Sequence, residues 1–152
     1  MTKRLSVDHE LFEGIKLLGL VTPLKDYRLA YFINNELNLK LSRYADFTFE
    51  GKEGEYAWYY FSKGNKYHNI TLINNYHPHG KLVLEPKIDF LLMIKNVVAE
   101  EVVPEILAGL RKINGIPLAF LLNAAKIKNA DLLLEALEMH ELKEVIRPRK
   151  PK

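Results

Sequence analysis

The residues best suited to chemistry are Asp89 and a charged group of Lys25, Asp26 and Arg28 near the start of the first expected helix. Asp89 interrupts residues 88–94, IDFLLMI, the longest strongly apolar run in the chain. A buried carboxylate needs hydrogen-bond donors, a cationic partner or a shifted pKa. We expect Asp89 to pair with Arg28, Lys25 or a backbone N–H, because buried charges are usually paired. The alternative is a ligand-binding or catalytic cluster that joins Asp89 to Lys25, Asp26 and Arg28.

Histidine and serine offer weaker patterns. His77 and His79 are close neighbours and His68 precedes them, but no further ligand has the spacing of a metal motif, so we expect a solvated turn and no metal. The absence of cysteine excludes disulfides, thiolate zinc sites and cysteine nucleophiles. No Walker, Rossmann, HExxH or nucleophile-elbow pattern occurs. We therefore expect no cofactor, and an enzyme is the less favoured hypothesis.

One expected strand carries aromatic side chains on both faces. In residues 55–63, EYAWYYFSK, the side chains of Tyr56, Trp58 and Tyr60 point one way and those of their sequence neighbours point the other way. A strand of an antiparallel sheet with one wet face should instead alternate between apolar and polar residues. The face formed by Tyr56, Trp58 and Tyr60 is therefore the candidate interaction surface.

Three occupants of this aromatic face remain open. A second copy of the chain would bury aromatic side chains without needing basic ones, so we expect a non-enzymatic protein-interaction module that self-associates as a homodimer. Single-stranded nucleic acid is an alternative, because open aromatic sheet faces stack bases, although the interior of this strand has no Arg or Lys. The chain's own terminal segment is the third candidate cover.

Turn residues and periodicity predict the elements that position these side chains. Thr22 and Pro23 suit the N-cap and first position of a helix over residues 24–37. Pro104 predicts that the second helix starts near Val103 or is kinked there. The other expected elements are a first strand over residues 11–21, a strand within residues 39–49, a hairpin of residues 55–63 and 67–76, a central strand over residues 88–94, a last strand over residues 116–122 and a C-terminal helix over residues 132–142.

This order predicts an α+β fold of two layers. We expect a mostly antiparallel sheet with helices packed on one face, in a ferredoxin-like pattern with an extra strand. The length of 152 residues and a hydrophobic content of 48% suit one globular domain, which we place at residues 1–146.

Charge is unevenly distributed along the chain. The net charge of +3 includes four basic residues in the expected disordered tail, residues 147–152, and two more at Lys3 and Arg4, which leaves −3 for residues 5–146. A slightly acidic body argues against a folded surface that binds nucleic acid. No stretch has the roughly 20 apolar residues of a membrane span, and the start lacks a signal-peptide pattern, so we expect a cytoplasmic protein.

Two stretches resemble the IPExxxVDY family of small uncharacterised bacterial proteins. They are residues 22–35, TPLKDYRLAYFINN, and residues 81–95, KLVLEPKIDFLLMIK. Ile88, Asp89 and Phe90 stand where the family has Val-Asp-Tyr, whereas residues 82–84, LVL, replace its Ile-Pro-Glu. The resemblance implies a bacterial source and supports the α+β fold, and it implies no activity.

Overall fold

The computed structural model describes residues 14–49, 54–62, 69–77, 80–95 and 99–146. In chain order these residues form β1 (Ile15–Val21), α2 (Asp26–Leu37), β2 (Ser42–Arg43), β3 (Trp58–Ser62), β4 (Asn69–Asn74), β5 (Tyr76–His77), β6 (Gly80–Lys81), β7 (Phe90–Lys95), α3 (Ala99–Leu110), β8 (Leu118–Leu121), the 3-10 turn η1 (Ala124–Lys126), α4 (Ala130–Glu141) and the π-helical turn η2 (Leu142–Ile146).

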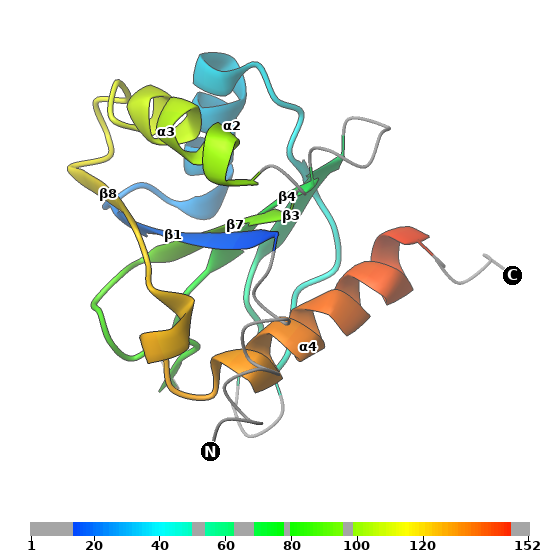
Figure 1. Cartoon of the computed structure of the whole chain (residues 1–152). Helices are drawn as coiled ribbons and strands as arrows, with labels where there is room; N and C mark the ends of the chain where they lie inside the picture. Colours follow the sequence, from blue (N-terminus) through cyan, green and yellow to red (C-terminus); the bar gives the residue numbers. More distant parts are fainter. Residues whose placement is uncertain (1–13, 50–53, 63–68, 78–79, 96–98, 147–152) are drawn as a thin grey trace, which may run out of the picture.

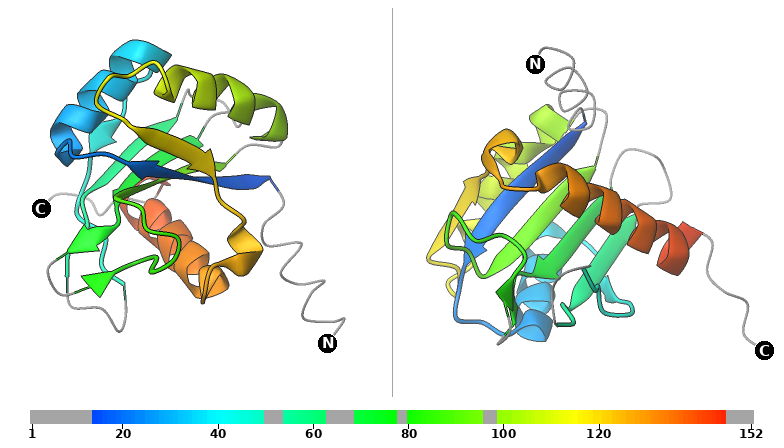
Figure 2. Two further views of the ribbon diagram at one scale, coloured as in Figure 1. Left: turned by 90° about the vertical axis from the view of Figure 1, so that its left-hand side faces the viewer. Right: turned by 90° about the horizontal axis from the view of Figure 1, so that it is seen from below.

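One antiparallel sheet has the strand order β2-β3-β4-β7-β1-β8, and α2 and α3 lie on one of its faces (Figure 1). Within it, β1, α2, β4, β7, α3 and β8 follow the βαββαβ order of ferredoxin-like folds, and β3 and β2 extend that core. The predicted α+β class, antiparallel sheet and extra strands are confirmed. The C-terminal helix α4 lies against the opposite face (Figure 2, right).

The apolar run in the middle of the chain forms an inner strand of the sheet, as predicted. β7 pairs with β4 on one side and β1 on the other, and Leu91, Leu92 and Ile94 are completely buried. β3 and β4 form the predicted hairpin. Because β7 begins at Phe90, Asp89 lies just before the strand and is half-buried.

Successive residues of β7 enter two different cores. Leu92 and Ile94 pack with α2 and α3, whereas Leu91 and Met93 pack with α4. This alternation follows from the two-residue period of a strand. Both faces of the sheet are apolar, so each face requires a helical cover.

The first helix starts two residues later than predicted. α2 begins at Asp26 with Lys25 as its N-cap, and the Thr22 hydroxyl lies in the turn before it. That hydroxyl donates to the carbonyl oxygen of Gly115 and accepts from the Leu24 N–H at 3.1 Å. Thr22 therefore ties the end of β1 to the turn after α3.

One other element differs from its prediction. The expected strand within residues 39–49 is reduced to β2 and an isolated bridge between Phe47 and Tyr56. For the second helix, the alternative of a start near Val103 is wrong, since α3 begins at Ala99 and includes Pro104. Since the first four N–H groups of a helix have no intrahelical acceptor, a proline at the sixth position removes only one such hydrogen bond.

Asn75 organises the connection between β4 and β7. Its side chain is fully buried. Its Nδ2 donates to the carbonyl oxygens of Val83 at 2.9 Å and Ile88 at 3.0 Å, and its Oδ1 accepts from the Val83 N–H at 2.7 Å. Its backbone N–H donates to the carbonyl oxygen of Asp89 at 2.9 Å. One amide therefore holds the whole loop in front of the inner strand.

We predict that Asn75→Ala lowers the free energy of unfolding by about 3 kcal/mol, because it leaves three buried backbone groups without partners and each costs roughly 1–3 kcal/mol. Asn74→Ala is the matched control. Its side chain accepts one hydrogen bond, from the Tyr76 N–H, and it should cost less than about 1 kcal/mol. Urea unfolding followed by Trp58 fluorescence measures both, and equal losses would contradict this role for Asn75.

Candidate functional site

Asp89 is held by the backbone. Its Oδ2 accepts from the Thr22 N–H at 2.8 Å, and its own N–H donates to the carbonyl oxygen of Leu20 at 2.8 Å. Of the partners considered for Asp89, the structure assigns a backbone N–H. No ion pair joins Asp89 to Lys25 or Arg28 within the described part of the chain. The carboxylate thus fixes the exit of β1 against the start of β7.

The predicted cluster of Lys25, Asp26, Arg28 and Asp89 does not assemble. Asp26, in the first turn of α2, turns to the sheet, where its Oδ2 accepts from Tyr59 Oη at 2.7 Å. Lys25 and Arg28 are exposed, and the Arg28 guanidinium lies 5.8 Å from the centre of the Phe32 ring. The physical reason is that each carboxylate has another partner: Asp26 binds Tyr59 and Arg43, and Asp89 accepts from the Thr22 N–H.

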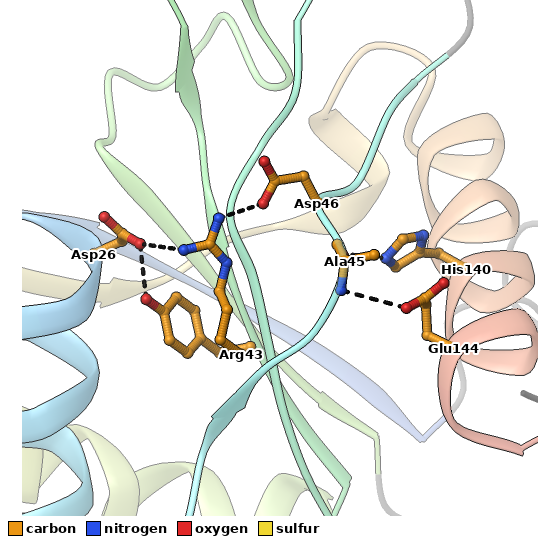
Figure 3. A network of polar contacts seen from close by, with 7 residues as sticks. Asp26, Arg43, Ala45, Asp46, His140 and Glu144 are labelled. Atoms are coloured by element: carbon orange, nitrogen blue, oxygen red, sulfur yellow. Dashed lines mark hydrogen bonds and ion pairs between the residues drawn. The ribbon is translucent and has the colours of Figure 1, made fainter. Parts of the chain in front are cut away.

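Asp26 belongs to another network, centred on Arg43 (Figure 3). Arg43 Nη1 lies 3.3 Å from Asp26 Oδ2, and Nη2 pairs with Asp46. Burial, together with the hydrogen bond to Asp26, raises the pKa of Tyr59 to about 12. Tyr59 therefore stays protonated near neutral pH and acts as a donor to Asp26.

The same segment is also held from the other side of the molecule (Figure 3). His140 Nε2 lies 2.9 Å from the carbonyl oxygen of Ala45, and the Ala45 N–H donates to Glu144 Oε1 at 3.3 Å. The segment after β2 is thus fixed to α2 by Asp26 and to the C-terminal helix by His140 and Glu144. The polar groups of this network bind one another, and their arrangement suits a structural tie between α2 and the C-terminal region.

The expectation of an open aromatic face is corrected by the structure. Tyr56, Trp58 and Tyr60 are only 0%, 1% and 5% exposed. They pack in the core beneath α4, and the Trp58 ring meets the His140 ring edge to face at 4.6 Å between centroids. Of the three occupants considered, the chain's own terminal segment covers this face, because an apolar face of this size would otherwise meet water.

Glu141 holds α4 on this face. It was not among the residues identified from the sequence. It is 2% exposed, and its carboxylate accepts from Tyr60 Oη at 2.7 Å and from Lys95 Nζ at 3.0 Å. Burial and the Glu141 carboxylate together raise the pKa of Tyr60. The available signal was a carboxylate on the apolar stripe of the helix, in line with Leu134 and Leu137.

The histidine motif contributes no site to the described chain. His77 is in β5, whereas His68 and His79 lie outside the described residues, as does the tail at 147–152. Within the residues that the structure describes, no group of three or more His, Asp or Glu side chains is placed to hold a metal. Among these same residues, no helix has the length and apolar character needed to cross a membrane.

The remaining unusual feature is the outer edge of β8. β8 is the last strand in the sheet order and lies across the front of the left view in Figure 2. Leu118 and Leu121 are 51% and 50% exposed there. A groove of about 380 Å³ adjoins the end of the strand, and its lining includes Leu17, Leu121 and Ala124. An apolar sheet edge therefore faces the exterior of the described chain.

Backbone groups of β8 also point outward. The Leu122 N–H donates to the carbonyl oxygen of Leu17 at 2.8 Å, which makes these residues a hydrogen-bonded pair of the β1–β8 ladder. Such pairs alternate along an antiparallel ladder, and Leu121 and Ala119 occupy the alternate positions. The N–H and C=O groups of Ala119 and Leu121 therefore point away from β1, but only Leu121 is exposed, since Ala119 is 1% exposed.

Basic residues precede and follow β8 in the sequence. Between residues 106 and 130 the charged residues are Arg111, Lys112, Lys126 and Lys128, and all four are exposed. Arg111 reaches the strand itself, since its Nε and Nη2 lie 3.3 Å and 3.0 Å from the carbonyl oxygen of Ala119. This run without a single acidic residue was visible in the sequence. In the structure Lys112 lines a groove together with Glu36, and Lys126 and Lys128 line another together with Glu85, so Arg111 is the cation placed at the strand itself.

No protein-family model, curated protein or solved structure matches the chain. The resemblance to IPExxxVDY proteins therefore stays a prediction that rests on the residues around Asp26 and Asp89.

We predict that Glu141→Gln lowers the free energy of unfolding by about 2 kcal/mol, because it leaves the partly buried Lys95 ammonium without a counter-charge. Glu138→Gln, at an exposed position of the same helix, is the control and should change stability by less than about 0.5 kcal/mol. Denaturant unfolding of the two variants makes the comparison. Equal stability of both variants would mean that Glu141 does not hold α4 on the sheet.

Proposed function

We propose that this protein is a non-enzymatic interaction module that binds an extended acidic segment of another protein along the outer edge of β8. The observation that carries the proposal is the apolar and outward-directed edge of β8, with Leu118 and Leu121 half-exposed. Sheet edges bind extended peptides by strand addition, in which main-chain hydrogen bonds supply affinity and alternate side chains supply specificity.

The two edges of the sheet differ in a way that supports this choice. β2, at the opposite end, is only two residues long and carries Arg43, which is tied to Asp26 and Asp46. Short and charged edge strands are a common protection against unwanted pairing. β8 is longer, apolar and adjoined by the groove next to Leu121, where a side chain of the incoming strand would fit.

Charge favours a foreign segment over a second copy. Two copies joined edge to edge would bring Arg111 of each chain, which contacts β8, towards the same edge of the other. Like charges across an interface disfavour association, whereas an acidic segment would be attracted to the same surface. The proposal therefore keeps the interaction module expected from the sequence and replaces the aromatic face with the β8 edge.

The nucleic-acid alternative has less support. Base stacking would need Trp58 and its neighbours to be accessible, and α4 covers them. The small-ligand alternative centred on Asp89 is also weakened, because that carboxylate already accepts the Thr22 N–H.

The test uses a synthetic pool of extended peptides in which apolar residues alternate with Asp or Glu. We expect the pool to shift the amide NMR signals of Ala119 and Leu121. Leu121→Pro removes one outward N–H without removing a β1–β8 hydrogen bond and should weaken binding about tenfold, which is the value of one strong hydrogen bond.

Leu121→Ala is the matched control, because it shortens the same half-exposed side chain and keeps the N–H. It should weaken binding less than Leu121→Pro, and both variants should keep the thermal stability of the parent protein. Three results would overturn the proposal: no shift with the peptide pool, tighter binding of an oligonucleotide than of the pool, or a dimer that Leu121→Pro dissociates.

A further inference from the structure

The side chain of Arg111 already occupies an acceptor of the β8 edge. Arg111 continues the last turn of α3, where its N–H donates to the carbonyl oxygen of Leu107 at 3.0 Å. From there its guanidinium donates through Nε and Nη2 to the outward carbonyl oxygen of Ala119. No carboxylate among the described residues forms an ion pair with Arg111.

This contact conflicts with strand addition by a neutral peptide. An incoming strand must donate an N–H to the carbonyl oxygen of Ala119, which the guanidinium already occupies. A neutral partner would displace the Arg111 guanidinium from this oxygen without supplying a charged acceptor for it. A partner carboxylate can instead take the guanidinium as a bidentate ion pair, the stronger arrangement for that group.

We propose that Arg111 is the specificity-determining residue of the β8 edge: its guanidinium blocks Ala119 until a carboxylate of the partner strand takes it over. This inference rests on the proposed function, because it assigns the selection of acidic partners to one residue. Selection then depends on a local exchange, in which Arg111 gives up its hydrogen bonds to Ala119 and pairs with a carboxylate of the partner.

The neighbouring residue provides a matched control. Lys112 carries the same charge and is exposed, and no hydrogen bond or ion pair to β8 is present for it in the described chain. Arg111→Gln and Lys112→Gln therefore remove equal charge from adjacent positions of the chain. Only the first removes the group that contacts Ala119.

The experiment measures binding of two peptide pools to the full-length protein and to both variants. In one pool Glu alternates with apolar residues, and in the other Gln takes its place. We expect the parent protein and Lys112→Gln to prefer the Glu pool about tenfold, which is the order of one charge-assisted pair. Arg111→Gln should lose that preference and bind the Gln pool at least as well as the parent protein does.

A second readout reports on the guanidinium itself. The Nε–H NMR signal of Arg111 should move with the Glu pool and much less with the Gln pool. Equal loss of preference in both variants, or unchanged preference in Arg111→Gln, would overturn the role of Arg111 while leaving strand addition intact. Failure of the parent protein to bind either pool would instead overturn strand addition and this inference together.

Discussion

The fold depends on a sheet whose inner strands are apolar on both faces. Residues of β7 alternate between the core under α2 and α3 and the core under α4, so neither face can be left to water. A ferredoxin-like arrangement supplies helices for one face only. The C-terminal helix provides the second cover, and its placement turns the most aromatic strand of the chain into part of the interior.

Polar groups within these cores form hydrogen bonds with residues that lie far away in the sequence. Glu141 meets Tyr60 and Lys95 beneath α4, and Asn75 satisfies the loop before β7. An unpaired polar atom at either place would cost much of the gain from burial. With both faces closed and the short β2 edge tied by ion pairs, the exposed side of β8 is the part of the sheet best suited to contact another chain.

Periodicity and turn residues were enough to predict the α+β class, the β3–β4 hairpin and the inner strand, because these depend on local patterns. They failed where one side chain serves a distant partner. The Thr22 hydroxyl donates to Gly115, which lies far away in the sequence, and Glu141 binds a tyrosine from the other half of the chain. The β8 edge was missed because exposure depends on strand order, although the basic run around it could be seen in the sequence.

Amide hydrogen exchange of the isolated protein along β8 tests the central claim most directly. We expect the Leu121 amide to exchange rapidly, because it points away from β1 and Leu121 is half-exposed. The Phe120 amide, which pairs with Gly19, should be strongly protected. Protection of Leu121 equal to that of Phe120, at a protein concentration low enough to prevent association, would show that the edge is already covered at this position and would contradict strand addition there.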